Sequence, residues 1–229
     1  NSYSSEDGTL LGNSGTTLIC CPEGKTSVSI PSSVTSIGDN AFDGCTGLTN
    51  IVIPENVTSV GSDIFSGCTN LESVTFSGSV SSTCVAEIIG ELPQNTVIEA
   101  ADTNSFSSVI QGINNANSSV SLSLENCTGL TTLADNAFQG CDNLASVTLP
   151  ASVTSISGTA FSGCSDLVSI TVSPDNNSYS SKNGTLLDKN KTTLICCPEG
   201  KTEVSIPSSV TTIGDNAFDG CTGLTNIVI

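Results

Sequence analysis

The chain has 229 residues, with five lysines, no arginine and 22 acidic residues, and its formal net charge is −17. Because nucleic acids and anionic membrane surfaces are bound by clustered cations, this composition argues against both as partners. Histidine, tryptophan and methionine are absent and only 4% of the residues are aromatic, which removes the commonest general base and the commonest metal ligand.

The first and the last 53 residues are two copies of one segment. Residues 1–53 and 177–229 differ at only eight positions, which indicates a recent duplication. In the second copy, residues 184–187 and 192–196 are predicted to form a β-hairpin across the turn 188–191. The chain begins in the middle of a unit and ends inside a predicted strand, so we expect it to be a fragment of a longer array.

A motif of the form Ala-Phe-x-Gly-Cys, or a close variant, recurs five times. Each copy lies in a unit of about two dozen residues, a period typical of solenoids, in which each unit covers the apolar face of the next. No apolar run approaches the roughly 18 residues that cross a bilayer, so no membrane insertion is expected in this segment. The copies occupy residues 41–45, 64–68, 137–141, 160–164 and 217–221.

The unit that starts at Leu48 shows how one repeat is expected to fold. Leu48, Ile51 and Ile53 have the spacing of a short strand with one buried face. In the preceding motif, Asp39 is predicted to cap one helical turn, and Gly44 is predicted to end that turn in the left-handed conformation.

Residues 77–118 lose the motif but keep its phase. They contain two helical patterns, which predict two atypical repeats with helices on the outer side and no independent domain. The first pattern is Val85, Ile88, Ile89 and Leu92, and the second is Phe106, Val109, Ile110 and Ile113. Across the chain, strands are expected to start about every 23–25 residues, near Leu48, Leu71, Asn95, Ser119, Leu144 and Leu167.

The repeated pattern resembles a known family. Residues 30–48 and 206–224 both read Ile-Pro-x-Ser-Val-Thr-x-Ile-Gly-x-x-Ala-Phe-x-Gly-Cys-x-x-Leu. This pattern is similar to the BspA-like class of leucine-rich repeats. The resemblance implies an α/β repeat solenoid over residues 1–229, a right-handed horseshoe with one short parallel strand per 23–25-residue repeat. Its strands would line the concave face, with short 3-10 or α turns outside and β-hairpin insertions.

The same resemblance implies a function. Members of the class are typically surface proteins of bacteria or protozoa that attach to host matrix proteins and cells, and the class has no catalytic residues to carry over. We therefore expect a non-catalytic cell-surface or secreted protein that mediates adhesion to a host protein partner and needs no cofactor. The alternative is a structural spacer or stalk of a cell-envelope protein, with binding carried elsewhere.

The outward side of the strands is the candidate binding site. The second, third and fifth positions of each strand are predicted to face out, as a nearly uncharged ribbon for an extended protein partner. The alternative is that these are merely β-prone solvated positions. Few aromatics and no arginine mean no obvious hot spot, so binding would gain from multivalency. The residues are Thr49, Asn50, Val52, Glu72, Ser73, Thr75, Ala145, Ser146, Thr148, Val168, Ser169, Thr171, Thr225, Asn226 and Val228.

The eleven cysteines are interpreted as structural. The five Gly-Cys residues occupy equivalent positions, so they are expected to form a buried column of small apolar side chains. Neighbours such as Cys45 and Cys68 could oxidise only with suitable Cβ geometry. Each vicinal pair, 20–21 and 196–197, is expected to point one thiol in and one out. Zinc is disfavoured, because there is neither histidine nor a Cys-x-x-Cys pair.

Residues 175–177 have a faint likeness to a calcium loop. The ligand spacing and the terminal glutamate of a helix-loop-helix site are missing, so a turn is predicted there instead.

Overall fold

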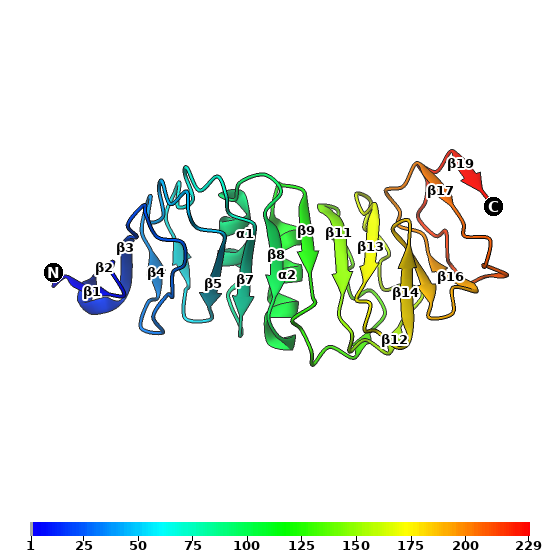
Figure 1. Ribbon diagram of the computed structural model, residues 1–229, viewed down its shortest axis with the longest axis horizontal. Coiled ribbons are helices and arrows are strands. Elements are labelled where there is room, and N and C mark those ends of the chain that lie inside the picture. The colour runs from blue at the N-terminus through cyan, green and yellow to red at the C-terminus, as the bar shows by residue number, and fades with distance from the viewer. Residues whose placement is uncertain (1) are drawn as a thin grey trace. The chain divides into compact units, whose positions relative to one another are not determined.

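Parallel strands stacked at the repeat interval dominate the computed structural model, which describes residues 2–229 (Figure 1). Its contacts separate a first unit, ending at Ser118, from a second unit, Ser119–Ile229. The expectation of one continuous solenoid over residues 1–229 stays a prediction.

The first unit begins with antiparallel strands and continues with parallel strands and two helices. Its elements are β1 (Ser4–Glu6), β2 (Thr9–Gly12), the 3-10 turn η1 (Asn13–Gly15), β3 (Thr17–Cys20), β4 (Ser36–Ile37), β5 (Asn50–Pro54), β6 (Ser59–Val60), β7 (Ser73–Ser77), α1 (Ser82–Gly90), β8 (Val97–Ala100) and α2 (Thr103–Asn115).

The second unit is built from strands alone within the described residues. They are β9 (Val120–Ser123), β10 (Thr132–Leu133), β11 (Leu144–Leu149), β12 (Ser155–Ile156), β13 (Ser169–Val172), β14 (Tyr179–Lys182), β15 (Thr185–Asp188), β16 (Thr193–Cys196), β17 (Glu203–Ser205), β18 (Thr212–Ile213) and β19 (Asn226–Val228).

The principal ladder of each unit confirms the predicted repeat interval. In the first unit, β5, β7 and β8 pair in parallel, and Ile51, Val74 and Ile98 lie side by side and buried. In the second unit, β9, β11 and β13 pair in the same way around the buried Val147 and Ile170. Because side chains alternate across a strand, the residues between these positions face outward.

A second, shorter ladder runs through each unit and was not predicted. Strands β4 and β6 pair in the first unit, and β10 pairs with β12 and β16 with β18 in the second. Each of these strands except β16 has two residues, so the local sequence gives no alternation to detect.

The Phe-Gly-Cys segment of each repeat is a turn that stacks on the next copy. Phe42 and Phe65 stack with ring centroids 5.4 Å apart, and the N–H of Phe42 donates to the carbonyl of Ile64 at 3.0 Å. Gly44 has φ +69°, which confirms the left-handed ending of the turn. The cap assigned to Asp39 was wrong: its carboxylate accepts from the N–H of Ser62, 2.8 Å away in the next repeat.

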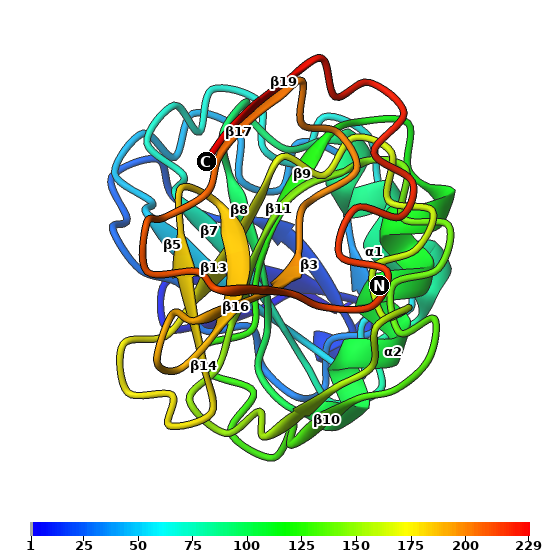
Figure 2. The ribbon, with the colours of Figure 1, turned by 90° about the vertical axis from the view of Figure 1, so that its right-hand side faces the viewer.

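The two atypical repeats contain the predicted helices, α1 and α2. Figure 2 shows both helices on the side of the first unit opposite β5. The buried face of α1 includes Val85, and α2 approaches it through Gly112, where a Cβ would overlap the Val85 side chain. This contact geometry explains why a glycine lies in the middle of α2 despite its poor helix propensity. Asp102 starts α2 with a capping box to Ser105.

The cysteines of the motif are buried, as predicted, except that Cys221 is only half-buried. Thiols of the column also donate to backbone carbonyls of the preceding repeat, for example Cys68 to Phe42 at 3.0 Å and Cys164 to Phe138 at 3.2 Å. Burial raises the pKa of Cys68 to about 11. The column therefore connects successive repeats as well as filling the core.

The vicinal cysteines follow the prediction in the first copy of the duplicated segment, where Cys20 is exposed and Cys21 is buried. In the second copy, Cys197 is buried, but Cys196 is half-buried instead of exposed. Burial raises the pKa of Cys196 to about 12.

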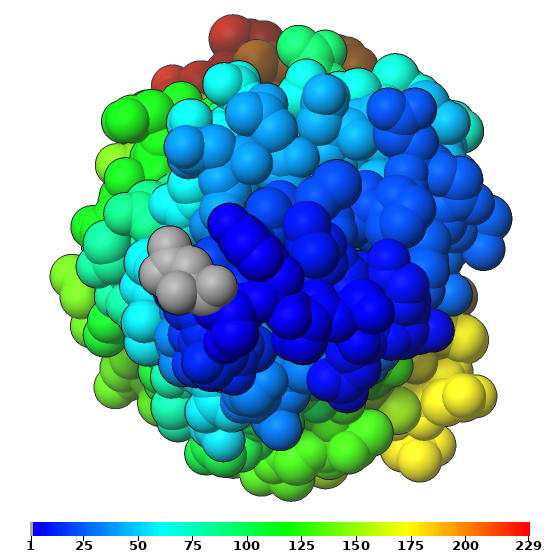
Figure 3. All heavy atoms as spheres, turned by 90° about the vertical axis from the view of Figure 1, so that its left-hand side faces the viewer, coloured from blue at the N-terminus to red at the C-terminus, as the bar shows by residue number. Residues whose placement is uncertain are grey.

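The predicted hairpin is present as β15 and β16, and an unpredicted third strand, β14, pairs antiparallel with β15. The first copy has the same arrangement in β1, β2 and β3. Figure 3 shows the residues that follow Asn1, in dark blue, spread over one end of the first unit.

Residues 175–177 form a turn, as predicted, around a fully buried Asn176. The side-chain nitrogen of Asn176 donates to the carbonyls of Pro150 and Val153, at 3.0 and 2.9 Å. Its side-chain oxygen accepts from the N–H groups of Ser178 and Tyr179, both at 2.8 Å. The amide thus joins the turn to the preceding repeat.

Candidate functional site

The outward side of the first unit carries two aligned rows of side chains. Asn50 lies beside Ser73, and Val52 lies beside Thr75. Val52 is 50% exposed although it is apolar. All four of these positions were predicted from the sequence.

Strand β8 extends both rows with residues that were not predicted. Val97 continues the row of Ser73, and Glu99 continues the row of Thr75. The Thr75 hydroxyl donates to the Glu99 carboxylate at 2.6 Å. The predicted nearly uncharged ribbon therefore has a carboxylate at this position. The sequence predicts a strand that starts near Asn95. Strand alternation from that start could have placed both residues on the outward side.

The second unit repeats the arrangement with hydroxyl groups. One row contains Ser146 and Ser169, and Ser121 of β9 extends it, with the Ser146 hydroxyl donating to Ser121 at 2.8 Å. The other row contains Thr148 and Thr171. Ser121 and its companion in the second row, Ser123, were also missed, because the segment before β9 forms α2 in place of the Ala-Phe-x-Gly-Cys motif.

Four of the predicted residues lie just before their strands, and Ala145 lies inside β11 at an irregularity in its pairing. The four are Thr49, Glu72, Val168 and Thr225, and all are exposed. Their backbones still connect neighbouring repeats. The N–H of Glu72 donates to the carbonyl of Thr49 at 2.7 Å, and the N–H of Val168 donates to the carbonyl of Ala145 at 2.9 Å.

The last three predicted residues, Thr225, Asn226 and Val228, lie at a separate two-stranded sheet. In that sheet, β19 pairs with β17, so Asn226 lies beside Glu203 and Val228 beside Ser205. Both partners on β17 were missed, because the hairpin insertion displaces this repeat from the regular interval.

The tip of the hairpin formed by β14 and β15 covers the edge of β13. The carbonyl of Gly184 accepts from the N–H of Ile170 at 2.9 Å, and the Ser181 hydroxyl accepts from the N–H of Val172 at 3.0 Å. Gly184 has φ +76°, and a Cβ there would lie 3.1 Å from the carbonyl oxygen of Val168. Glycine is therefore required at the tip by both its conformation and its packing.

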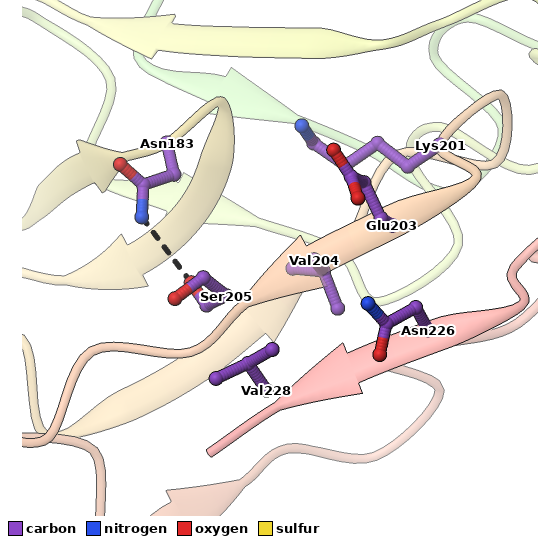
Figure 4. Close-up of a pocket in the computed structure, with 7 residues that line it drawn as sticks. All are labelled: Asn183, Lys201, Glu203, Val204, Ser205, Asn226 and Val228. Carbon is purple, nitrogen blue, oxygen red and sulfur yellow. Dashed lines mark hydrogen bonds between the residues drawn. The ribbon is translucent and has the colours of Figure 1, made fainter.

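An open groove of about 340 Å³ lies between the hairpin tip and β17 and β19. Figure 4 shows Asn183 at one side of this groove, donating to the Ser205 carbonyl at 3.3 Å, and Lys201 and Glu203 at the other side. The groove is also lined by Val204, Asn226 and Val228. It adds a cation, an anion and two apolar side chains to the largely neutral strand rows.

Neither helix in residues 2–229 is long and apolar enough to span a membrane. The thiols of the buried column are poor candidates for chemistry at neutral pH, because burial raises the pKa of Cys45 and of Cys141 to about 12. A thiol must be ionised to act as a nucleophile or a metal ligand.

A family model provides the sequence evidence for the identity of this fold. The model of the BspA type leucine rich repeat region matches six copies, over residues 21–86, 98–193 and 195–229. No curated protein sequence matches the chain.

Solved bacterial structures are similar to the chain. A leucine-rich repeat protein from Eubacterium ventriosum is 23% identical over 99% of this chain and 59% of its own, with a TM-score of 0.44. A leucine rich cell surface protein from Faecalibacterium prausnitzii is 21% identical over 100% and 76%, with a TM-score of 0.33. The pneumococcal vaccine antigen PcpA is 19% identical over 93% and 48%, with a TM-score of 0.35.

The chain thus spans 59% of the length of the first of these structures. Because the TM-scores are below 0.5, these likenesses add nothing to what the family model and the strand registers establish. Since that model matches most of the sequence, the chain belongs to the BspA-type leucine-rich repeat family.

Proposed function

We propose that this chain is a non-catalytic protein of the cell surface or the extracellular space that binds a protein partner along its outward strand rows. The observation that carries the proposal is the alignment of short polar side chains, such as Ser146 beside Ser169, over buried partners such as Val147 beside Ile170. Leucine-rich repeats of this family generally serve protein–protein interaction. The proposed location rests on the resemblance to this family, whose members are typically surface proteins.

An extended segment of the partner fits this surface best. The rows offer hydroxyl groups that can donate and accept hydrogen bonds, and the exposed Val52 and Val168 offer apolar contact. The groove at Asn183 and Lys201 adds a place where one larger side chain can be held. Without aromatic or arginine anchors each contact is weak, so affinity depends on how many rows are engaged together.

We further propose that the partner is a host matrix or cell-surface protein, so that the chain acts in adhesion. The competing proposal is a spacer of a cell envelope, which would need the same stacked strands but no contact with a partner. The two differ in what happens when the strand rows are changed without unfolding the chain.

The test compares two triple variants of the chain. The sheet variant is Thr49→Glu, Thr148→Glu and Thr171→Glu, which adds two charges to the strand rows and a third at the exposed Thr49 just before β5. The control is Thr69→Glu, Thr128→Glu and Thr222→Glu, which adds the same charges at exposed threonines in turns. Attachment to a panel of immobilised matrix proteins and to host epithelial cells is measured for both, after circular dichroism has verified folding.

We expect the sheet variant to attach at least about tenfold more weakly than the native chain, as a loss of ~1.4 kcal/mol or more in binding free energy requires. The control should attach like the native chain. Equal attachment of the sheet variant and the native chain would instead favour the spacer, and failure of the native chain to attach to any probe would count against adhesion.

A further inference from the structure

The two copies of the duplicated segment carry opposite charges in their hairpins. Residues 1–16 contain Glu6 and Asp7 and no lysine, so their side-chain charge is −2. Residues 177–192 contain three lysines and one aspartate, so their side-chain charge is +2. With Lys201, four of the five lysines of this acidic chain lie within residues 182–201.

The lysines of the second hairpin are not required to build it. The first hairpin folds with Glu6, Asn13 and Gly15 at the positions of Lys182, Lys189 and Lys191. One of the three, Lys189, donates to the carbonyls of Pro174 and Asn176 and so has a structural contact. Lys182 and Lys191 are exposed, and neither forms a salt bridge within residues 2–229.

Lys191 also occupies a position that suits glycine. Its φ is +59°, and its counterpart in the first copy is Gly15, with φ +90°. A residue with a Cβ is strained in the left-handed region, whereas glycine is not. A residue held in such a conformation is a reason to look for a function.

A groove of about 390 Å³ lies beside these cations. Lys189 and Lys191 line it together with the hydroxyl-bearing Ser173, Tyr179, Ser180 and Ser181. Tyr179 accepts from the N–H of Ile156 through its phenolic oxygen at 3.0 Å, which leaves its O–H to donate. The groove thus combines two ammonium groups, several hydroxyls and the side chain of one aromatic residue, within the size range of small-ligand sites.

This combination suits an anionic sugar better than an acidic peptide. A peptide that binds here by adding a strand would need free backbone groups at a strand edge. At β13 the N–H groups of Ile170 and Val172 are already bonded, to Gly184 and Ser181. A sugar needs instead hydroxyl partners for its own hydroxyls, and a sulfate or carboxylate on it would meet the lysines.

We propose that the groove beside β14 and β15 binds a sulfate- or carboxylate-bearing sugar of an anionic polysaccharide, held by Lys189 and Lys191. This site is separate from the strand rows and does not depend on the protein-binding function proposed above. It would let the chain contact anionic glycans despite its net charge of −17.

Four polymers serve as probes, tested by biolayer interferometry at about 0.15 M salt, where the Debye length is about 8 Å. Dextran sulfate carries sulfate only, polygalacturonate carries carboxylate only, dextran is neutral, and poly-L-glutamate is anionic without sugar. We expect dextran sulfate or polygalacturonate to bind, and the one that binds identifies the anion. Equal binding of poly-L-glutamate, or binding of neither anionic polysaccharide, would overturn the proposal.

The first copy of the duplicated segment shows which residues the hairpin accepts when it folds, and the variants use those residues. Lys182→Glu, Lys189→Asn and Lys191→Gly together give the second hairpin the residues of the first at its three lysine positions. They should weaken polysaccharide binding at least about tenfold by removing charge-assisted contacts. Lys191→Gly alone should weaken binding. It should leave thermal stability unchanged or higher, because glycine adopts the left-handed backbone conformation of this position without strain. If neither variant weakens binding, the groove is not the site.

A charge-matched variant separates the groove from simple charge attraction. It combines the three changes above with Glu6→Lys, Asn13→Lys and Gly15→Lys, so the net charge is that of the native chain. Lys189 and Lys191 line the groove beside Val172 and Ser173, so this variant, which lacks both lysines there, should bind as weakly as the triple variant. Native-like binding by the charge-matched variant would show that charge alone suffices and would overturn the proposal.

Discussion

The rings of Phe138 and Phe161 stack with their centroids 4.9 Å apart and their planes inclined by 13°. The two rings come from successive copies of the repeat motif, and the N–H of Phe138 also donates to the carbonyl of Ala160 at 2.9 Å. One repeat therefore completes the core of its neighbour, which is how units too small to fold alone become stable.

Replacing Phe161 by alanine should lower the free energy of unfolding by about 3–5 kcal/mol, the usual cost of truncating a buried phenylalanine. Urea denaturation followed by circular dichroism measures it. The control is Phe218→Ala, because Phe218 is only half-buried and should cost less. Similar losses at the two positions would show that the stack does not set the stability.

Replacing Gly163 by valine should destabilise the chain by about 1–3 kcal/mol, the range for a residue forced into an unfavourable backbone conformation. Gly163 has φ +80° at the end of its turn. Gly223→Val is the matched control, since a Cβ at Gly223 meets no atom within 4 Å and its φ is not in the left-handed region. If the denaturation midpoints of both variants equal that of the native chain, the turn assignment fails.

Replacing Asn176 by alanine should cost at least about 3 kcal/mol, because each buried polar group left without a partner costs about 1–3 kcal/mol. The substitution removes the partners of four backbone groups, among them the carbonyl of Val153 and the N–H of Tyr179. The neighbouring Asn177 is exposed, and Asn177→Ala should change the stability by less than about 0.5 kcal/mol. Thermal melts of the two variants measure both losses, and equal melting temperatures would contradict the role given to Asn176.

The buried thiols predict a loss of stability in alkali. Burial raises the pKa of Cys45 from 9.0 to about 12 and that of Cys68 to about 11. Above pH 9 the unfolded chain releases these protons while the folded chain retains them, so the unfolded state binds fewer protons and stability falls as pH rises. Their contribution is therefore complete below about pH 9 and is lost between about pH 9 and 12.

Denaturation at a series of pH values tests this prediction. The variant Cys45→Ala with Cys68→Ala should show a shallower decline above about pH 9 than the native chain. Cys20→Ala is the control, since Cys20 is exposed, and it should leave the decline unchanged. A native-like slope in the double variant would contradict the account of the column.

Those parts of the fold that the repetition encodes could be predicted. The strand interval, the helices α1 and α2, the β15–β16 hairpin and the left-handed Gly44 are confirmed, because each depends on periodicity or on turn residues within a short window. The cap assigned to Asp39 was wrong, because its carboxylate accepts a hydrogen bond from Ser62 of the next repeat. Local spacing cannot distinguish a cap within the turn from a bond to the next repeat.

The candidate site was only partly predictable. Asn50, Ser73, Ser146 and Ser169 lie on the outward rows as expected, because strand alternation determines their side. The groove at Asn183 could not be predicted, since it arises where the hairpin tip meets a strand about 20 residues later in the chain. That these surfaces bind a partner stays a prediction.

The register of the principal ladders is the physical basis of the whole account, and a crystal structure of the chain tests it most directly. We predict Asn50 beside Ser73 and Ser146 beside Ser169, with Ile51, Val74, Val147 and Ile170 buried beneath them. Because a slip of one residue moves every side chain of a strand to the other face, a register shifted by one would contradict the account. Those apolar side chains would then face outward, and the proposed binding rows would not exist.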